Sequence, residues 1–291
     1  MKPIGVATDS HSGIVPDVAK RLGIMVLPMP FFIEDECYYE EVSITRDEFF
    51  KQLRSGKTVS TSQPSPEAVM EFWREGLKEY EKILYIPMSS GLSGSCNTAK
   101  MLAEESEFEG KIYVVDNGRV STPLHRSILD ALELIEEGHG AEEIKEILEE
   151  ARDKMVIYLG VETLEYLKKG GRITPATAAI GTLLNIKPVL KFDVGSLETY
   201  RKCRGMKKAR REMLEAMKRD FETTFRDYYQ NGEVYLLAAS SADAATTQGW
   251  IEEIQEFFPG MEIQCDVLSL GLSCHAGEGA LGIGCSCRPR R

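Results

Sequence analysis

The sequence contains no run of about 20 apolar residues, the length that a membrane-spanning helix requires. Residues 1–9 carry one lysine and no long apolar stretch, so we expect neither a secretory signal nor stable insertion into a membrane. Positive charge is in deficit, since 35 Lys and Arg stand against 46 Asp and Glu and leave a net charge of −11. An acidic chain repels a phosphate backbone, which argues against nucleic acid as a partner.

Neither cysteine nor histidine shows a spacing that indicates cross-links or a metal site. The seven cysteines are an odd number scattered along 291 residues, unlike the disulfide framework of a small secreted protein, so we expect a protein of the reducing cytoplasm. The four histidines show no metal-ligand spacing. Because Cys274, Cys285 and Cys287 also lack a fourth ligand, we expect no metal site.

In the first half of the chain, short apolar runs alternate with longer helical patterns. Residues 83–88 predict a strand, and residues 66–80 predict a helix that Ser65 caps and Pro66 begins. Strands that alternate with helices indicate a parallel sheet covered by helices. We therefore predict an α/β domain over residues 1–155.

The pattern changes in the second half. A strand is predicted at residues 155–160 and a helix at 174–184. The apolar runs at 187–192 and 196–202 are separated by Asp-Val-Gly, which is typical of a β-hairpin. A hairpin among helices indicates a mixed sheet, so we predict a second α/β domain over residues 156–291.

A loop rich in hydroxyl groups follows the strand predicted at 83–88. Residues 89–95 read SSGLSGS and precede a predicted helix. Ligands of parallel α/β sheets bind at this edge, and the N–H groups at a helix start attract anions. The loop, with Ser93 and Gly94 at its end, therefore predicts a site for a carboxylate or phosphate.

The same loop allows a serine hydrolase as an alternative. Ser93 would be the nucleophile on a strand–turn–helix. Asp266, one of several acidic residues before His275, would give the order Ser, Asp, His of such a triad. The final glycine of the G-x-S-x-G pattern is missing, however, because residue 95 is serine.

Three other segments carry polar groups with two interpretations each. Thr61 and Ser62 add hydroxyl groups ahead of the helix at 66–80, whose cap and turn do not require them. Arg172 follows a predicted helix end, which its cations and glycines explain by themselves or which places Arg172 beside a ligand. Residues 201–211 hold seven cations, which indicate either a solvated helix face or a surface that binds an acidic partner. The glycine-rich residues 277–282 predict a close approach of the backbone to a ligand or to another strand.

Taken together, these segments resemble the DegV family of bacterial fatty-acid-binding proteins, over essentially the whole chain. The matching segments are TDS at 8–10, TSQPS at 61–65, SSGLSG at 89–94, LKKGGRI at 167–173, LNIKPV at 184–189, Arg204-Gly205 with the pair Lys207 and Lys208, and His275 before the glycine-rich segment.

The resemblance implies two α/β domains and a long-chain fatty acid in a buried apolar tunnel, with no other cofactor and no catalytic residue. It implies that the carboxylate is held by groups that match Thr61, Ser62, Ser93, Gly94, Arg172 and His275. It also implies a carrier that presents the acid to a separate fatty-acid kinase, which forms an acyl phosphate for phospholipid synthesis. The residue that matches Arg204 would face the kinase, with Lys207 beside it.

The chain departs from the family pattern at three places. Glu41 stands where the family usually has Asp, and Glu278 stands where Pro is common. A carboxylate at Glu278 would repel a bound fatty acid, so we expect it to point away from the site. The Cys285-Ser286-Cys287 segment is unusual, and the sequence offers no account of it.

Overall fold

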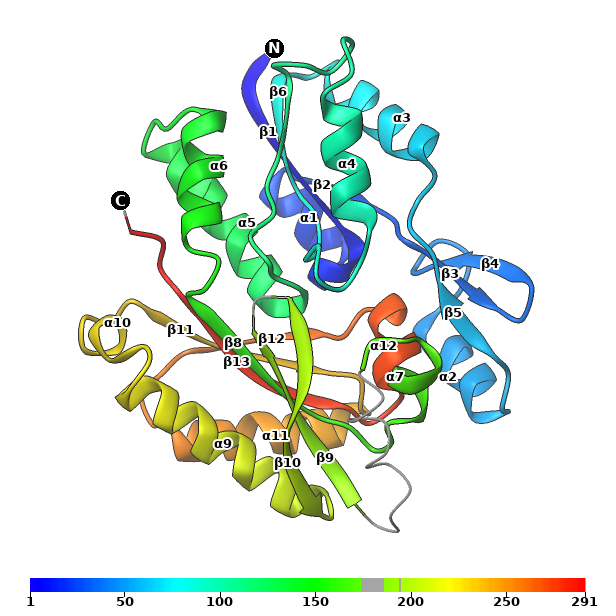
Figure 1. The fold of residues 1–291 in the computed structure, drawn as a ribbon, viewed down its shortest axis with the longest axis vertical. Helices are drawn as coiled ribbons and strands as arrows, with labels where there is room; N and C mark the ends of the chain where they lie inside the picture. Colours follow the sequence, from blue (N-terminus) through cyan, green and yellow to red (C-terminus); the bar gives the residue numbers. More distant parts are fainter. Residues whose placement is uncertain (174–185, 194, 291) are drawn as a thin grey trace.

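The computed structural model describes residues 1–173, 186–193 and 195–290 (Figure 1). The helix predicted at 174–184 and the central residue of the predicted hairpin turn lie outside them. A four-stranded sheet with its helices stands above a six-stranded sheet in Figure 1, and a three-stranded sheet lies at one side. Within the described ranges, no helix has both the length and the apolar character needed to span a bilayer.

The four-stranded sheet is parallel throughout, in the order β2-β1-β6-β7. Its strands are β1 (Lys2–Asp9), β2 (Met25–Leu27), β6 (Tyr80–Ile86) and β7 (Ile112–Val114). Its helices are α1 (Pro16–Leu22), α3 (Pro66–Gly76), α4 (Ser95–Ala103), α5 (Ser121–Glu136) and α6 (Ala141–Glu150). Val6 and Leu84 pack with α1, α5 and α6, whereas Ala7 and Ile83 pack with α3 and α4. Helices therefore cover both faces, as the alternation of strands and helices predicts.

Helix α3 begins where the sequence predicts and ends earlier. Ser65 Oγ accepts a backbone N–H of the first turn at 3.2 Å, and Pro66 is the first helical residue. The helix ends at Gly76, and Tyr80 instead begins β6, where it pairs with Lys2 of β1. The prediction that this helix reaches residue 80 was wrong, because pairing in the sheet overrides the helical spacing of Tyr80.

The six-stranded sheet is mixed, in the order β10-β9-β8-β13-β11-β12. Only β11 and β12 are parallel neighbours among these described strands. The strands are β8 (Met155–Gly160), β9 (Ile186–Asp193), β10 (Ser196–Arg204), β11 (Val234–Ser240), β12 (Ile263–Val267) and β13 (Leu281–Cys287). Helices α9 (Met206–Glu222) and α10 (Arg226–Gln230) follow β10, and α11 (Ala244–Phe257) follows β11. The predicted hairpin is confirmed by the antiparallel pairing of β9 with β10.

The sequence did not predict β13, which lies at the centre of this sheet between β8 and β11. A Cβ on Gly284 would lie 2.7 Å from the carbonyl oxygen of Val156, so the two strands meet at a point where a side chain has no room. Gly284 lies two residues beyond the glycine-rich residues 277–282, whose last residue, Gly282, pairs with Leu159 of β8 and Ala239 of β11. Cys285 and Cys287, fully buried on β13, pack in the core beneath α9 and α11.

A three-stranded antiparallel sheet, in the order β4-β3-β5, was also missed. It consists of β3 (Pro30–Ile33), β4 (Glu36–Tyr39) and β5 (Val59–Thr61), packed with α2 (Arg46–Arg54). Its strands are too short for an alternating pattern to be recognised. Phe31 and Phe49 from this unit share a core with Leu270 and Cys274 of α12 (Leu270–Ala276).

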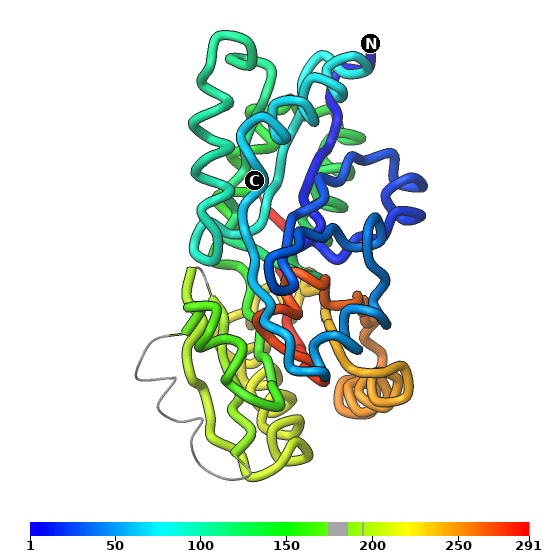
Figure 2. The backbone as a smooth tube through the Cα atoms, turned by 90° about the vertical axis from the view of Figure 1, so that its right-hand side faces the viewer, coloured from blue at the N-terminus to red at the C-terminus, as the bar shows by residue number. Residues whose placement is uncertain are grey.

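Residues 30–61 therefore lie beside a helix near the other end of the sequence, as the blue and orange-red tubes show in Figure 2. The four-stranded sheet uses strands up to Val114, and the six-stranded sheet uses strands from Met155 on. The division of the chain into domains at residue 155 stays a prediction.

Candidate functional site

A cavity of about 250 Å³ lies between the two larger sheets. His11 and Met88, which follow β1 and β6, line one side of it, and Leu159 of β8 lines the other. The six-stranded sheet thus presents one face to the cavity, while its other face packs against α9 and α11. All six residues predicted to hold a ligand line this cavity: Thr61, Ser62, Ser93, Gly94, Arg172 and His275.

Ser93 and Gly94 lie at the end of the loop between β6 and α4. Ser93 Oγ accepts a hydrogen bond from the backbone N–H of Ser95 at 3.2 Å and donates to Ser95 Oγ at 3.0 Å. Gly94 is the N-cap residue of α4 and provides no side-chain cap. The loop therefore brings a hydroxyl group and the start of a helix to the cavity wall, as expected for an anion site.

Thr61 and His275 meet although 214 positions separate them in the sequence. Thr61 ends β5, and His275 lies in the last turn of α12, which the three-stranded sheet supports. The Thr61 Oγ1 atom lies 2.9 Å from His275 Nε2. Ser62 donates its hydroxyl hydrogen to the carbonyl oxygen of Gln63 at 3.1 Å and is more exposed. The neighbouring Thr61 is therefore the residue of this segment whose hydroxyl group contacts the half-buried histidine.

His275 is held neutral by its surroundings. Burial lowers its pKa from 6.5 to about 4, and Arg172 and His11 contribute to the same shift. The Nδ1 atom is buried without a hydrogen-bond partner among the described residues. It faces Gly170 so closely that a Cβ there would lie 2.0 Å from it. Gly170 therefore fixes how far the imidazole ring can turn.

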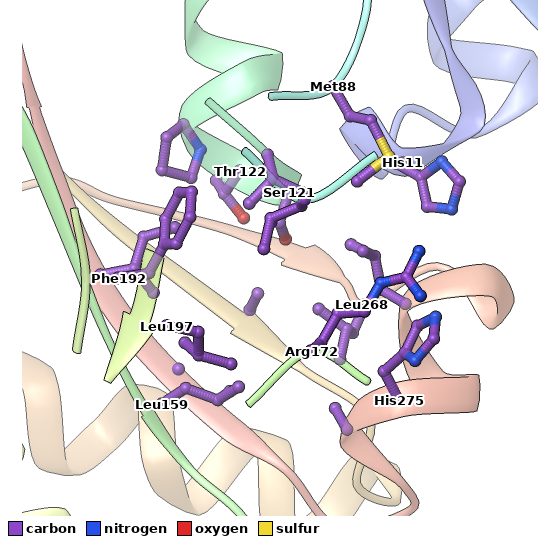
Figure 3. A pocket seen from close by; sticks show the side chains of 18 of the residues that line it. His11, Met88, Ser121, Thr122, Leu159, Arg172, Phe192, Leu197, Leu268 and His275 are labelled. Carbon is purple, nitrogen blue, oxygen red and sulfur yellow. The ribbon is translucent and has the colours of Figure 1, made fainter. Parts of the chain in front are cut away.

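Arg172 follows α7 (Glu165–Lys169), after the glycines that end that helix. Its Nη1 group donates to the carbonyl oxygen of Gly170 at 2.6 Å, which leaves further guanidinium N–H groups at the cavity. Figure 3 places Arg172 and His275 next to each other at one side of the cavity. This side, which we call the polar end, is also lined by Thr61 and Ser93.

The opposite side, which we call the apolar end, is formed by side chains of the six-stranded sheet. Figure 3 shows Leu159, Phe192 and Leu197 there, from β8, β9 and β10. Gly282 and Gly284 of β13 face the same space and contribute no side chain to it. The cavity thus combines a polar head region with an apolar space behind it.

His11 lines the cavity and was not predicted as a site residue. It follows Asp9, which is fully buried and accepts hydrogen bonds from the backbone N–H groups of His11 at 2.9 Å and Met88 at 2.8 Å. Asp9 therefore ties the loops after β1 and β6 together at the cavity wall. A single histidine without another ligand at a fixed spacing does not indicate a site in a sequence. The one available indication was that His11 follows directly on residues 8–10, one of the segments that match the family.

The geometry does not assemble the triad of a serine hydrolase. Asp266 binds His125, with 3.0 Å between its Oδ2 atom and Nδ1, and not His275. His275 pairs with Thr61, and the Ser93 hydroxyl bonds within its own loop. Among the described residues, the hydrolase alternative therefore has no supporting hydrogen bonds.

The remaining predicted positions lie away from the cavity. Arg204 and Lys207 are exposed at the end of β10 and the start of α9. Glu278 points outward and forms an ion pair with Arg54 at the surface, as expected. Within the described residues, no group of His, Cys, Asp and Glu has the arrangement of a metal site.

Comparisons with known proteins agree with the fold over nearly the whole chain. The family model described as "Uncharacterised protein, DegV family" matches residues 3–287. A DegV domain-containing protein of Caldanaerobacter subterraneus subsp. tengcongensis is 34% identical over 218 residues, which cover 75% of this chain and 78% of that protein.

Two solved structures are similar in fold as well as in sequence. One is described as showing fatty acid binding of a DegV family protein from Thermus thermophilus; it has a TM-score of 0.85 and 34% identity, and the match covers 98% of this chain and 99% of that one. The other is described as DegV, a fatty acid binding protein from Bacillus subtilis, with a TM-score of 0.83, 28% identity and coverage of 99% and 100%. The combination of a parallel N-terminal sheet with a mixed C-terminal sheet is common to this fold.

Proposed function

The chain belongs to the DegV family, and from that premise we propose that it binds a long-chain fatty acid in the cavity between its two larger sheets. The carboxylate would lie at the polar end and the acyl chain at the apolar end. One observation carries the proposal: six residues from four separate segments line a single cavity whose opposite side is formed by leucine and phenylalanine. The fatty acid binding described for the Thermus thermophilus and Bacillus subtilis relatives supports it.

A carboxylate removed from water must be paired or fully hydrogen-bonded. The polar end offers the hydroxyl group of Ser93, whose hydrogen would turn from Ser95 Oγ to the carboxylate. It also offers the N–H groups in the first turn of α4 and the guanidinium group of Arg172. Among these donors, the guanidinium group of Arg172 carries the full positive charge. His275 adds none, because it is neutral above a pH of about 4. One cation then balances one carboxylate.

The neutral form of His275 orients the hydroxyl group of Thr61. The Nδ1 atom has no described partner, and an unpaired buried N–H is rarer than an unpaired acceptor. We therefore assign the proton to Nε2, from which it is donated to Thr61 Oγ1. The hydroxyl hydrogen of Thr61 is then directed away from the ring and is available to a carboxylate.

We further propose that the protein presents its fatty acid to a fatty-acid kinase, as the family resemblance implies. Within the basic segment, Arg201, Arg210 and Arg211 form ion pairs with glutamates. The exposed side chains of Lys202, Arg204, Lys207 and Lys208 form no ion pair among the described residues. These four side chains, which we call the free basic patch, remain available to an acidic partner.

Native mass spectrometry of the purified protein tests the binding function. We expect a bound mass equal to that of a long-chain fatty acid, which denaturation releases. A protein that carries no such mass and also fails to bind added fatty acid in calorimetry would disprove the proposal. Release of product from an ester substrate, abolished by Ser93→Ala, would instead favour the hydrolase.

Charge reversal tests the carrier function separately. Arg204→Glu with Lys207→Glu should leave fatty-acid affinity unchanged but slow phosphorylation of the bound acid by the kinase. Added salt should slow the wild-type reaction in the same way. Arg211→Glu is the matched control, since its positive charge already pairs with Glu215 at 2.8 Å. An equal decrease in the phosphorylation rate of both variants would contradict a role for the free basic patch.

A further inference from the structure

The cavity has a second polar feature, at the start of α5. Ser121, the first residue of this 16-residue helix, lines the cavity and has a φ of 56°, a left-handed conformation that is uncommon for serine. The preceding Val120 is extended, with a φ of −155°. The chain therefore turns sharply here, and Figure 3 shows the Ser121 side chain projecting from the helix start toward the cavity.

The hydroxyl group of Ser121 has no hydrogen-bond partner among the described residues, although the residue is only 6% exposed. The hydroxyl group of Thr122, which is also buried, donates to the carbonyl oxygen of Ala238 at 2.7 Å. Buried hydroxyl groups in folded proteins normally find such a partner. Ser121 therefore differs from its neighbour in retaining an unused donor and acceptor at the cavity wall.

The backbone at the start of α5 adds donors at the same place. Val120 provides no side-chain cap, and the N–H groups of a first helical turn have no acceptor within the helix. Pro123 has no N–H, so Ser121 and Thr122 supply the first two of these groups. An oxygen atom that enters this part of the cavity would meet a hydroxyl group and backbone donors together.

The surroundings favour a neutral oxygen over an anion. The cavity-lining residues next to Ser121 and Thr122 in the sequence, Val120 and Pro123, are apolar and supply no positive charge to balance an anion. The cation that lines the cavity, Arg172, is drawn apart from Ser121 in Figure 3. A hydroxyl group suits the Ser121 side chain because both can donate and accept.

We infer that Ser121 forms a second subsite, which recognises a hydroxyl group carried by the acyl chain itself. The inference rests on the proposed function, since it requires the acid's carboxylate at the polar end. With the carboxylate fixed there, only a hydroxyl group at a matching distance along the chain can reach Ser121. The cavity would thus select hydroxy fatty acids by the position of the substituent.

Calorimetry with stearic acid and a series of monohydroxystearic acids, each with its hydroxyl group at a different carbon, tests this inference. A buried hydroxyl group without a partner weakens binding, so most isomers should bind less tightly than stearic acid. The isomer that reaches Ser121 should bind roughly 3- to 10-fold more tightly than its neighbours in the series. Ser121→Ala and Ser121→Gly should both abolish that preference and retain stearic acid binding.

The two substitutions separate the hydroxyl group from the backbone conformation, because glycine adopts a positive φ freely and alanine does not. Ser127→Ala is the control: it removes a buried hydroxyl group of the same helix outside the cavity lining, and the ratio between isomers should persist. If all isomers are weakened equally in the wild type and in Ser121→Ala, Ser121 binds at most a water molecule and the inference is wrong. If stearic acid itself does not bind, the proposed function fails instead.

Discussion

The two ends of the cavity are built in different ways. The polar end takes its groups from loops and helix ends, where Thr61, Ser93, Arg172 and His275 arrive from distant parts of the sequence. The apolar end takes alternate residues from neighbouring strands of one sheet, such as Leu159 and Phe192. The polar end can therefore fix a ligand by a few directed bonds, whereas the apolar end can select it only by shape and area.

This difference leads to separate expectations for substitutions at each end. Changes at the polar end should alter affinity for every fatty acid alike, because every fatty acid has the same carboxylate. Changes at the apolar end should alter the ranking of fatty acids by chain length. A substitution at one end that produces the effect expected at the other end would contradict this distinction between the two ends.

The largest effect is expected for Ser93→Ala. Loss of one hydrogen bond to a carboxylate should weaken binding by roughly 1.5–3 kcal/mol for all chain lengths, without unfolding the protein. Titration calorimetry measures the affinity and thermal unfolding checks the fold. Ser90→Ala, in the same loop but outside the cavity lining, should bind normally. Unchanged affinity in Ser93→Ala would remove Ser93 from the site.

A pH effect on stability should come next in size. In the protein without fatty acid, His275 stays neutral down to a pH of about 4, whereas an unfolded histidine gains a proton near 6.5. The unfolded state thus binds more protons between these values, and the contribution of His275 to stability falls as the pH falls. From pH 7 to pH 5 the loss should be about 2 kcal/mol.

Asp130 titrates in the same window with the opposite sign, since burial raises its pKa to about 6. The measurement is therefore the difference between the unfolding free energies of the wild type and His275→Gln, followed from pH 7 to pH 4. Asp130 is common to both proteins and cancels. A difference that does not change with pH would contradict a His275 that is neutral in the folded protein.

Gly170→Ala should have a smaller effect on binding. The new Cβ would overlap His275 Nδ1 and turn the ring away from Thr61, at a cost of about 1 kcal/mol for one neutral hydrogen bond. Gly140→Ala is the matched control, because its φ of −79° resembles the −76° of Gly170 and no atom lies within 4 Å. Equal affinities in the two variants would show that the position of His275 is unimportant.

The smallest effect is expected at the apolar end. Leu197→Ala should leave the affinity for a short acid nearly unchanged and improve that for a longer one by about 0.8 kcal/mol for each CH₂ group that enters the new space. The measurement is the ratio of affinities along a series of saturated acids. A uniform loss across the series would place Leu197 outside the acyl space.

The sequence predicted features that depend on neighbouring residues and missed those that depend on contacts between distant segments. The cap at Ser65 and the loop that carries Ser93 depend on neighbouring residues, and the structure has them as predicted. The lining by Leu159 and Gly284 depends on which strands become neighbours, and β13 was not recognised as a strand at all. The pairing of Thr61 with His275 follows from a three-stranded sheet that no local pattern revealed.

The distance in sequence between Thr61 and His275 has a consequence for how the protein is made. When the ribosome adds Thr61, 214 more residues must follow before its partner exists. Closing so long a loop costs entropy before any contact between its ends repays it. A nascent chain should therefore acquire fatty-acid affinity late and abruptly, only after α12 has been made.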